Sequence, residues 1–314
     1  MIDILFMGTP EFSIASLEAI ADSGNNLIGV VTQPDRPRGR GKRLSPSPVK
    51  RWALKEDIFV FQPQNINTKD SVRLLSSLEP DLIVTAAYGQ ILSKAVLEIP
   101  PLGCINVHAS LLPKYRGAAP IQQAIIDGEK ETGITIMYME EGMDTGGIIL
   151  QRAISIGPDE NAGSLHDRLA ILGKEVLRES LDLFKHGRAD ATKQDDCLAT
   201  YCKKIDKSLG EIDWQMSNHN IHNLVRGLSP WPGCFTFYEG ERLKILETRI
   251  VERQASKIKA PGEIVQSDTS AGLIVACGHG LIRLKNIQGE GKRAMKDTTY
   301  LMGNPLTEGT ILGR

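Results

Sequence analysis

Residues 2–32 of the chain read IDILFMGTPEFSIASLEAIADSGNNLIGVVT. The apolar runs from Ile2 to Phe6 and from Leu27 to Thr32 have the length and composition of buried strands. Between them, the segment from Pro10 to Asp22 carries apolar residues at helical spacing. A strand, a helix and a second strand in this order form the unit of an open parallel sheet, so this stretch predicts an α/β fold.

The same alternation continues through the first half of the chain. Further strands are expected over residues 58–61, 82–86 and 104–108, and a strand pair over 134–139 and 148–156. Helical spacing predicts helices over residues 46–55, 68–78 and 164–184, the last with Ser164 as its N-cap. The predicted fold class is therefore an open, Rossmann-like, mostly parallel sheet, and such sheets bind ligands at the carboxyl ends of their strands.

The turn after the first strand, Gly8-Thr-Pro-Glu-Phe12, occupies the place of a phosphate-binding turn in dinucleotide folds. It lacks the Gly-x-Gly-x-x-Gly pattern, and Pro10 removes one backbone donor. We therefore expect a simple strand-to-helix turn, with a ligand edge as the alternative, and no nicotinamide cofactor.

The pattern changes in the second half. Residues 190–207 mix charges, Thr and Asp without periodicity and are interpreted as a linker. Beyond them, one helix is expected over 214–228, followed by short strands over 234–238, 243–251, 262–266, 272–277 and 281–287. The sequence thus predicts a catalytic domain over residues 1–189, a linker over 190–207, and a small β-barrel of OB type over 208–314.

The composition, with 41% hydrophobic and 24% charged residues, is that of an ordinary globular protein. No apolar run approaches the roughly 18 residues of a membrane span, and the N-terminus lacks the regions of a signal peptide, so a cytoplasmic protein without membrane contact is expected. The five cysteines are scattered and form no Cys-x-x-Cys pair, which predicts buried free thiols and no metal site.

A polar pair ends the predicted strand at 104–108. Asn106 and His108 are two residues apart, so their side chains share one face at the expected ligand edge. The segment Ser110-Leu-Leu-Pro113 that follows predicts a short apolar lip closed by a rigid turn, and Gly117 permits close backbone approach. A structural histidine is the alternative, but a polar pair beside an apolar lip is typical of a small-molecule site.

A second turn, Glu140-Glu-Gly-Met-Asp-Thr-Gly-Gly147, carries Asp144 among three glycines. An aspartate in a glycine-rich hairpin turn is most often structural. Beside an imidazole, however, a carboxylate can accept a proton or hold the ring in the required orientation. We therefore take Asp144 as the third member of a candidate catalytic set with Asn106 and His108.

Residues 33–51 concentrate positive charge. The segment holds seven Lys and Arg residues against one Asp, and its Gly and Pro residues are expected to keep it out of regular structure. Residues 1–207 otherwise lean acidic, with 24 basic and 27 acidic side chains, whereas residues 208–314 carry 13 and 11. A solvated surface loop is the alternative, but this concentration at a strand end favours a partner with phosphates.

As a set, these residues resemble the methionyl-tRNA formyltransferase family, from Met1 to the C-terminus. Asn106, His108 and Asp144 with Ser110-Leu-Leu-Pro113 are similar to the signature of enzymes that use 10-formyltetrahydrofolate, whatever their acceptor. More specific are the Pro-Asp-Arg-Pro and Gly-Arg-Gly-Lys loop, Val225-Arg-Gly-Leu-Ser-Pro-Trp-Pro-Gly233, and Gln-Gly-Glu-Gly-Lys-Arg-Ala-Met295. Arg38, Ser229 and residues 289–295 depart from the usual family pattern.

The resemblance implies formyl transfer from 10-formyltetrahydrofolate to the α-amino group of methionine on initiator Met-tRNA. It implies Asn106 and His108 as donors to a tetrahedral oxyanion, with Asp144 orienting His108 or taking the amine proton through water. Folate would be held by Ser110, Leu111, Leu112, Pro113 and the backbone near Leu92. The acceptor stem would be contacted by Arg36, Arg38, Arg40, Lys42 and Arg43, with help from the C-terminal barrel.

A monomer with no tightly bound cofactor and no metal is expected. Three alternatives stay open: a folate-dependent formyltransferase for a small amine, a 10-formyltetrahydrofolate hydrolase, and a noncatalytic tRNA-binding protein. The first two account for the polar triplet but not for the basic segment and the barrel together, and the third predicts loss of the triplet.

Overall fold

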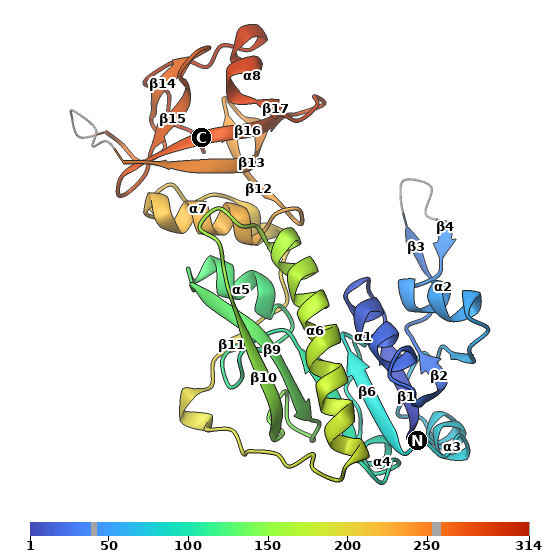
Figure 1. The fold of residues 1–314 in the computed structure, drawn as a ribbon. Coiled ribbons are helices and arrows are strands. Elements are labelled where there is room, and N and C mark those ends of the chain that lie inside the picture. The colour runs from blue at the N-terminus through green and yellow to red at the C-terminus, as the bar shows by residue number, and fades with distance from the viewer. Residues whose placement is uncertain (39–42, 253–258, 314) are drawn as a thin grey trace. The chain divides into compact units, whose positions relative to one another are not determined.

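The computed structural model describes residues 1–38, 43–252 and 259–313. The chain forms two compact units, whose elements are labelled in Figure 1. The first unit comprises Met1–Gly117, Thr132–Ile154 and His166–Tyr201. The second comprises Ala118–Glu131, Ser155–Leu165 and Cys202–Arg314.

The first unit is built on a seven-stranded sheet with the strand order β10-β9-β7-β6-β1-β2-β5. The strands are β1 (Asp3–Gly8), β2 (Asn26–Val31), β5 (Val60–Phe61), β6 (Leu82–Ala86), β7 (Cys104–His108), β9 (Glu131–Tyr138) and β10 (Ile148–Ser155). The five strands from β5 to β7 pair in parallel, and β9 joins β7 antiparallel. The predicted α/β class with a mostly parallel sheet is confirmed.

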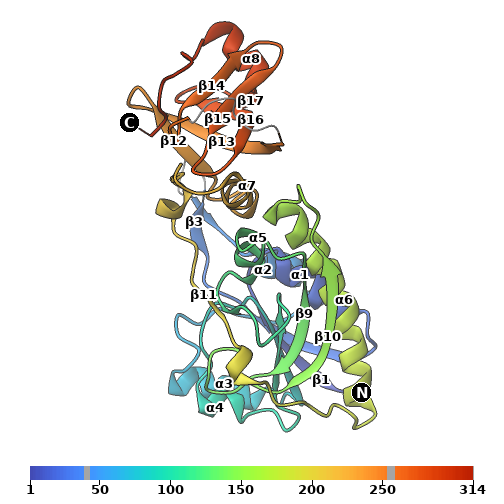
Figure 2. The ribbon, with the colours of Figure 1, turned by 90° about the vertical axis from the view of Figure 1, so that its left-hand side faces the viewer.

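Helices cover both faces of this sheet. They are α1 (Phe12–Ala21), α2 (Pro48–Lys55), α3 (Lys69–Ser77), α4 (Lys94–Leu97) and α6 (Ala162–Lys185). Leu5 and Met7 of β1 pack into one apolar cluster with Leu75 of α3 and Val96 of α4. Side chains alternate along a strand, so the β1 residues on either side of Leu5 face the opposite side of the sheet. Figures 1 and 2 show α1 and α6 on that side.

Two local predictions were wrong. Ser164 lies inside the first turn of α6, and it is Asn161 Oδ1 that accepts the Ser164 amide at 3.0 Å. The basic segment is not irregular, because β3 (Arg36–Arg38) and β4 (Arg43–Ser45) pair antiparallel as a two-stranded ribbon. A ribbon of two strands has only edge strands, where Pro37 can lack its amide without breaking a ladder.

The second unit contains an antiparallel sheet with the order β12-β13-β16-β15-β14, and β17 pairs with β16. The strands are β12 (Cys234–Tyr238), β13 (Glu241–Val251), β14 (Ile264–Asp268), β15 (Gly272–Ala276), β16 (Leu281–Gly289) and β17 (Met295–Lys296). The helices α5 (Pro120–Ile126), α7 (Asn218–Gly227) and α8 (Asp297–Gly303) belong to the same unit.

The C-terminal segment links the two outer strands of this sheet. The Ile264 amide of β14 donates to Thr310 O at 2.9 Å, and the Gly313 amide donates to Phe237 O of β12 at 2.7 Å. Both edges are therefore hydrogen-bonded through one segment, as the predicted barrel requires. The helix expected over 214–228 begins only at Asn218, because the Ser217 hydroxyl caps it by accepting the Asn220 amide.

Short elements connect the larger ones. They are β8 (Arg116–Gly117), paired with β11 (Tyr201–Cys202), and the 3-10 turns η1 (Asp196–Leu198) and η2 (Lys207–Gly210).

A buried ion pair supports the second unit. Asp297, at the start of α8, accepts two hydrogen bonds from the Arg283 guanidinium, at 2.8 and 3.0 Å. Burial raises the pKa of Asp297, but the Arg283 bonds and the amides of Leu273 and Thr298 outweigh burial and hold this pKa below its ordinary value. The carboxylate therefore stabilises the fold in its charged form.

Replacing Asp297 with alanine is expected to lower the free energy of unfolding by about 3 kcal/mol. This value is the lower end of the range for breaking a buried ion pair, because the Arg283 side chain is partly exposed to solvent. The pair's contribution is present above the unfolded-state pKa of about 3.9 and is lost as the pH falls through the lower folded-state value. Urea unfolding of the full chain, followed by tryptophan fluorescence at pH 7 and pH 3, measures both effects. An equal gap between parent and variant at the two pH values would contradict the linkage.

Candidate active site

The candidate site lies at the carboxyl end of β7, which carries Asn106 and ends at His108. Asn106 Oδ1 accepts a hydrogen bond of 2.8 Å from the hydroxyl of Thr85, on the neighbouring strand β6. That bond directs the Nδ2 end of the amide away from Thr85, and none of the described residues accepts a hydrogen bond from Nδ2. Thr85 thus orients the two free N–H donors of Asn106.

His108 is 5% exposed, and its Nε2 lies 3.0 Å from the carbonyl oxygen of Tyr115. A carbonyl only accepts, so Nε2 must carry a proton. In the neutral ring, Nδ1 is then the unprotonated nitrogen. Tyr115 is itself held in a left-handed conformation, with φ of 60°, and its amide donates to the Thr200 hydroxyl at 2.8 Å.

Asp144 stands on the Nδ1 side of the ring. Its Oδ2 lies 3.7 Å from His108 Nδ1, beyond a direct hydrogen bond but close enough for a charge interaction. The same oxygen accepts the Gly117 amide at 2.8 Å. The structure therefore brings Asp144, which is distant in sequence, to His108, and the Gly117 amide binds the same carboxylate oxygen.

The apolar lip is braced from inside. The Ser110 hydroxyl donates to Lys114 O at 2.6 Å, while the Thr135 hydroxyl donates to Ser110 O at 2.6 Å. Ser110 and Leu112 are buried, whereas Leu111 and Pro113 are half-buried. Leu111 and Pro113 are therefore the members of the lip that a ligand can reach.

Leu92 occupies a different position from the lip. Its side chain is 3% exposed and packs in the core cluster with Met7, Tyr88 and Val96. Its side chain is therefore not open to a ligand, and a folate contact at Leu92 would have to come from its backbone.

The turn after β1 is tied to the neighbouring strand ends. The Thr9 hydroxyl donates to Tyr88 O at 2.9 Å, and the Ser13 hydroxyl donates to Ala86 O at 2.6 Å. A Cβ on Gly8 would collide with the Phe6 ring and Ser13 Cβ. These contacts agree with a strand-to-helix turn that fixes the sheet edge.

The basic ribbon leaves the same unit after β2. Arg36 is exposed, and the backbones of Arg38 and Arg43 pair with each other. Arg40 and Lys42 lie outside the described residues. At its base, Lys50 pairs with Asp35 at 2.8 Å, so the one acidic residue of the segment is neutralised.

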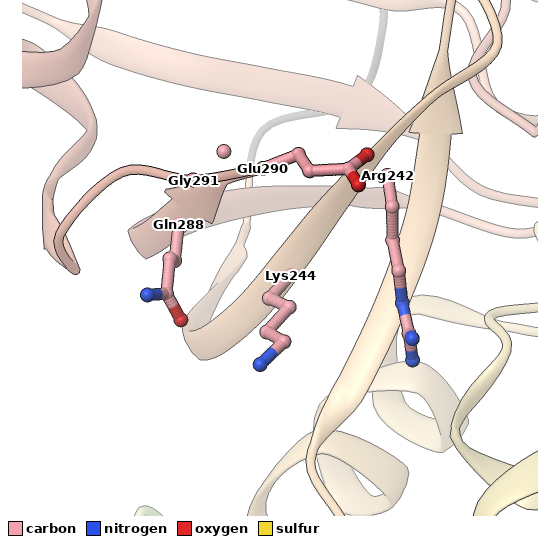
Figure 3. A pocket seen from close by; sticks show the side chains of 6 residues that line it. Arg242, Lys244, Gln288, Glu290 and Gly291 are labelled. Atoms are coloured by element: carbon pink, nitrogen blue, oxygen red, sulfur yellow. The ribbon is translucent and has the colours of Figure 1, made fainter.

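A pocket lies on the second unit, lined by residues of β13 and β16 and of the turn after β16 (Figure 3). Arg242 and Lys244 project from β13 beside Gln288 and Glu290. The Arg242 guanidinium carbon lies 3.6 Å from the centre of the Phe235 ring, a cation–π contact that holds this cation in place.

Sequence reasoning missed residues that support this site. Thr85 carried a detectable signal, since it is the one polar residue in the apolar run of β6. Tyr115 carried none, because its carbonyl reaches His108 through the conformation of the loop and not through a periodic pattern. Among the described residues, no helix is long and apolar enough to cross a membrane, and no His, Cys, Asp and Glu residues group as metal ligands would.

Comparison with known proteins identifies both parts of the chain. Residues 2–181 match the formyl transferase family, and residues 204–305 match the formyl transferase C-terminal domain family. The chain is 49% identical to the methionyl-tRNA formyltransferase of Ruminiclostridium cellulolyticum, with 99% of each chain covered. It is 50% identical to that of Caldanaerobacter subterraneus subsp. tengcongensis, over 98% of this chain and 99% of the relative.

Solved structures of lower identity share the fold. One is the sugar 3N-formyl transferase WlaRD, solved in the presence of dTDP and 5-N-formyl-THF. It is 20% identical to this chain and has a TM-score of 0.67, and the match covers 93% of this chain and 99% of WlaRD. Another is HypX from Aquifex aeolicus in complex with tetrahydrofolic acid, with a TM-score of 0.62, 16% identity, and coverage of 98% of this chain and 48% of HypX.

Proposed function

Because the chain belongs to the methionyl-tRNA formyltransferase family, we propose that Asn106, His108 and Asp144 carry out its reaction. The enzyme transfers a formyl group from 10-formyltetrahydrofolate to the α-amino group of methionine on initiator Met-tRNA. The observation that supports these roles is the geometry at the end of β7, where a free amide, an imidazole nitrogen and a carboxylate meet.

The demands of the reaction match these groups. Free α-amino groups titrate near pH 7.7–8, and the neighbouring ester lowers this pKa, so neutral, nucleophilic amine is available near pH 7 without a strong base. Stabilising the oxyanion of the tetrahedral intermediate is therefore the larger task. The Asn106 Nδ2 donors, oriented by Thr85, serve it directly.

His108 moves the proton. Nδ1 of the neutral ring accepts the proton that the amine loses as its nitrogen bonds the formyl carbon. The resulting cation donates toward the oxyanion and is paired with the Asp144 carboxylate 3.7 Å away. When the bond between the formyl carbon and N10 breaks, the proton passes to N10 and the neutral ring is restored.

Folate is bound as a cosubstrate and not as a resident cofactor. Leu111 and Pro113 contact its apolar ring, Ser110 and Leu112 hold the lip in shape, and the backbone near Leu92 meets the polar edge of the pterin. The folate-bound structures of WlaRD and HypX, which share this fold, support a folate site.

Two surfaces contact the tRNA in this proposal. Arg36, Arg38, Arg40, Lys42 and Arg43 of the ribbon bind the acceptor stem, and the domain over residues 208–314 adds Arg242 and Lys244, the cations shown in Figure 3. The division into a catalytic domain over 1–189, a linker over 190–207 and this tRNA-binding domain belongs to the proposal. So do a monomeric state and a cytoplasmic location.

Replacing both Lys42 and Arg43 with alanine is expected to lower the affinity for Met-tRNA and to make that affinity less dependent on salt concentration. Each lost phosphate contact should reduce the slope of log affinity against log salt concentration by about 0.7–0.9. Filter binding of initiator tRNA between low and high salt measures the slope. The matched control replaces Lys69 and Arg73, two exposed cations of α3, and an equal slope change in both doubles would count against the ribbon.

A formylation assay tests the acceptor. With 10-formyltetrahydrofolate as donor, initiator Met-tRNA should be formylated faster than elongator Met-tRNA, and a small amine should not replace either. Equal use of both tRNAs would refute the specificity. Formate release without an acceptor would favour the hydrolase alternative.

A further inference from the structure

The side chain of Gln194 is hydrogen-bonded to the turn that carries Asp144. Gln194 lies beyond α6 in the first unit and is 5% exposed. Its Nε2 donates to the carbonyl oxygens of Asp144 and Gly146, at 2.8 and 2.7 Å. A single side-chain amide therefore uses both of its hydrogens on the backbone of one turn.

The turn needs such support. It lies between the end of β9 and the start of β10, so residues 140–147 take no part in either strand. Asp144 adopts a φ of 54°, a left-handed conformation that an L-residue rarely holds without surrounding contacts. At Gly146 a Cβ would collide with the carbonyl of Tyr138, which leaves no room for another side chain.

Arg116 holds the other end of Gln194. Gln194 Oε1 accepts from Arg116 Nε at 3.1 Å and from Nη2 at 2.8 Å, and Nη2 also donates to Asp196 at 2.8 Å. Arg116 is 1% exposed, and the residue after it, Gly117, donates its amide to Asp144 Oδ2. The contacts close a ring in which the backbone and the carboxylate of Asp144 are held from the same two segments.

We propose that Gln194 is a positioning residue for formyl transfer, which fixes the Asp144 turn so that the carboxylate stays beside His108 Nδ1. The inference rests on the proposed role of Asp144. An amide is required at this position because it must donate to two carbonyls while accepting from a guanidinium. A carboxylate would satisfy Arg116 but would face the two carbonyls with no hydrogen to offer.

The variants Gln194→Glu and Gln194→Met distinguish the hydrogen bonds that Gln194 donates to the turn from those it accepts from Arg116. Gln194→Glu keeps an acceptor for Arg116 but replaces the two donors with a charged carboxylate oxygen, while Gln194→Met keeps the approximate volume, adds no charge and removes the donors and the acceptor together. Both should lower kcat about 10- to 100-fold and leave the KM values for folate and Met-tRNA within about twofold of the parent. Hydrogen exchange should become faster in peptides covering residues 140–147 and stay unchanged in β1 and β6. Gln215→Glu, the same change at an exposed position of the second unit, is the matched control.

A purely structural role would lower the melting temperature and the folded fraction, but would leave kcat per folded molecule and the exchange of the turn unchanged. A folded Gln194 variant with parental kcat overturns the inference; if Gln194→Glu does not fold, Gln194→Met decides. Asp144→Asn is assayed in parallel. Full activity in Asp144→Asn removes the proposed role of Asp144 and the inference with it, whereas an inactive Asp144→Asn beside active Gln194 variants removes the inference alone.

Discussion

Replacing Asn106 with alanine is expected to lower kcat about 100- to 1000-fold, because one oxyanion donor contributes about 2.7–4 kcal/mol at other acyl-transfer sites. Asn106 is only half-buried and its amide bonds one hydroxyl, so the substitution should leave the fold intact. The KM for Met-tRNA should change little, since the lost interaction forms mainly in the transition state. Single-turnover formylation with saturating 10-formyltetrahydrofolate measures the rate of the chemical step directly.

Thr85 supplies the matched controls for this prediction. Thr85→Val keeps the shape of the side chain but loses the hydroxyl that orients Asn106, so part of the loss at Asn106→Ala should appear. Thr85→Ser keeps the hydroxyl and should remain close to the parent. The assignment of Asn106 fails if Asn106→Ala turns over at the parental rate.

The sequence predicted the fold well where burial alone determines the element. The strands β6, β7 and β12 were predicted at the residues where they occur, because uninterrupted apolar runs bounded by turn residues leave little choice. The basic ribbon was missed, since Pro37 disfavours a strand and the pairing depends on the register of two strands of three residues each. Ser164 was misplaced as a cap because the helix already begins at Ala162, where Asn161 caps it by accepting the Ser164 amide.

The candidate site could also be predicted from the sequence only where a single element determines it. Asn106 and His108 follow from the two-residue period of a strand that ends at the ligand edge. The tautomer of His108, by contrast, depends on the carbonyl of Tyr115, and the turn of Asp144 depends on Gln194, fifty residues away in sequence. Periodicity describes one element at a time, so contacts that join separate loops leave no mark in it.

Replacing Asp144 with asparagine is expected to lower kcat about 100- to 10,000-fold, the range for acid–base catalysis, because His108 can act as acid and base only while its cation is stabilised by this carboxylate. The substitution is conservative for the backbone, since asparagine tolerates the φ of 54° and its Oδ1 can still accept the Gly117 amide. What it removes is the negative charge that pairs with the His108 cation formed during the reaction. The melting temperature should therefore stay within a few degrees of the parent while the chemical step collapses, and folate binding should persist in equilibrium titrations. A variant that keeps the fold but loses less than about tenfold in kcat would show that His108 cycles its proton without this carboxylate.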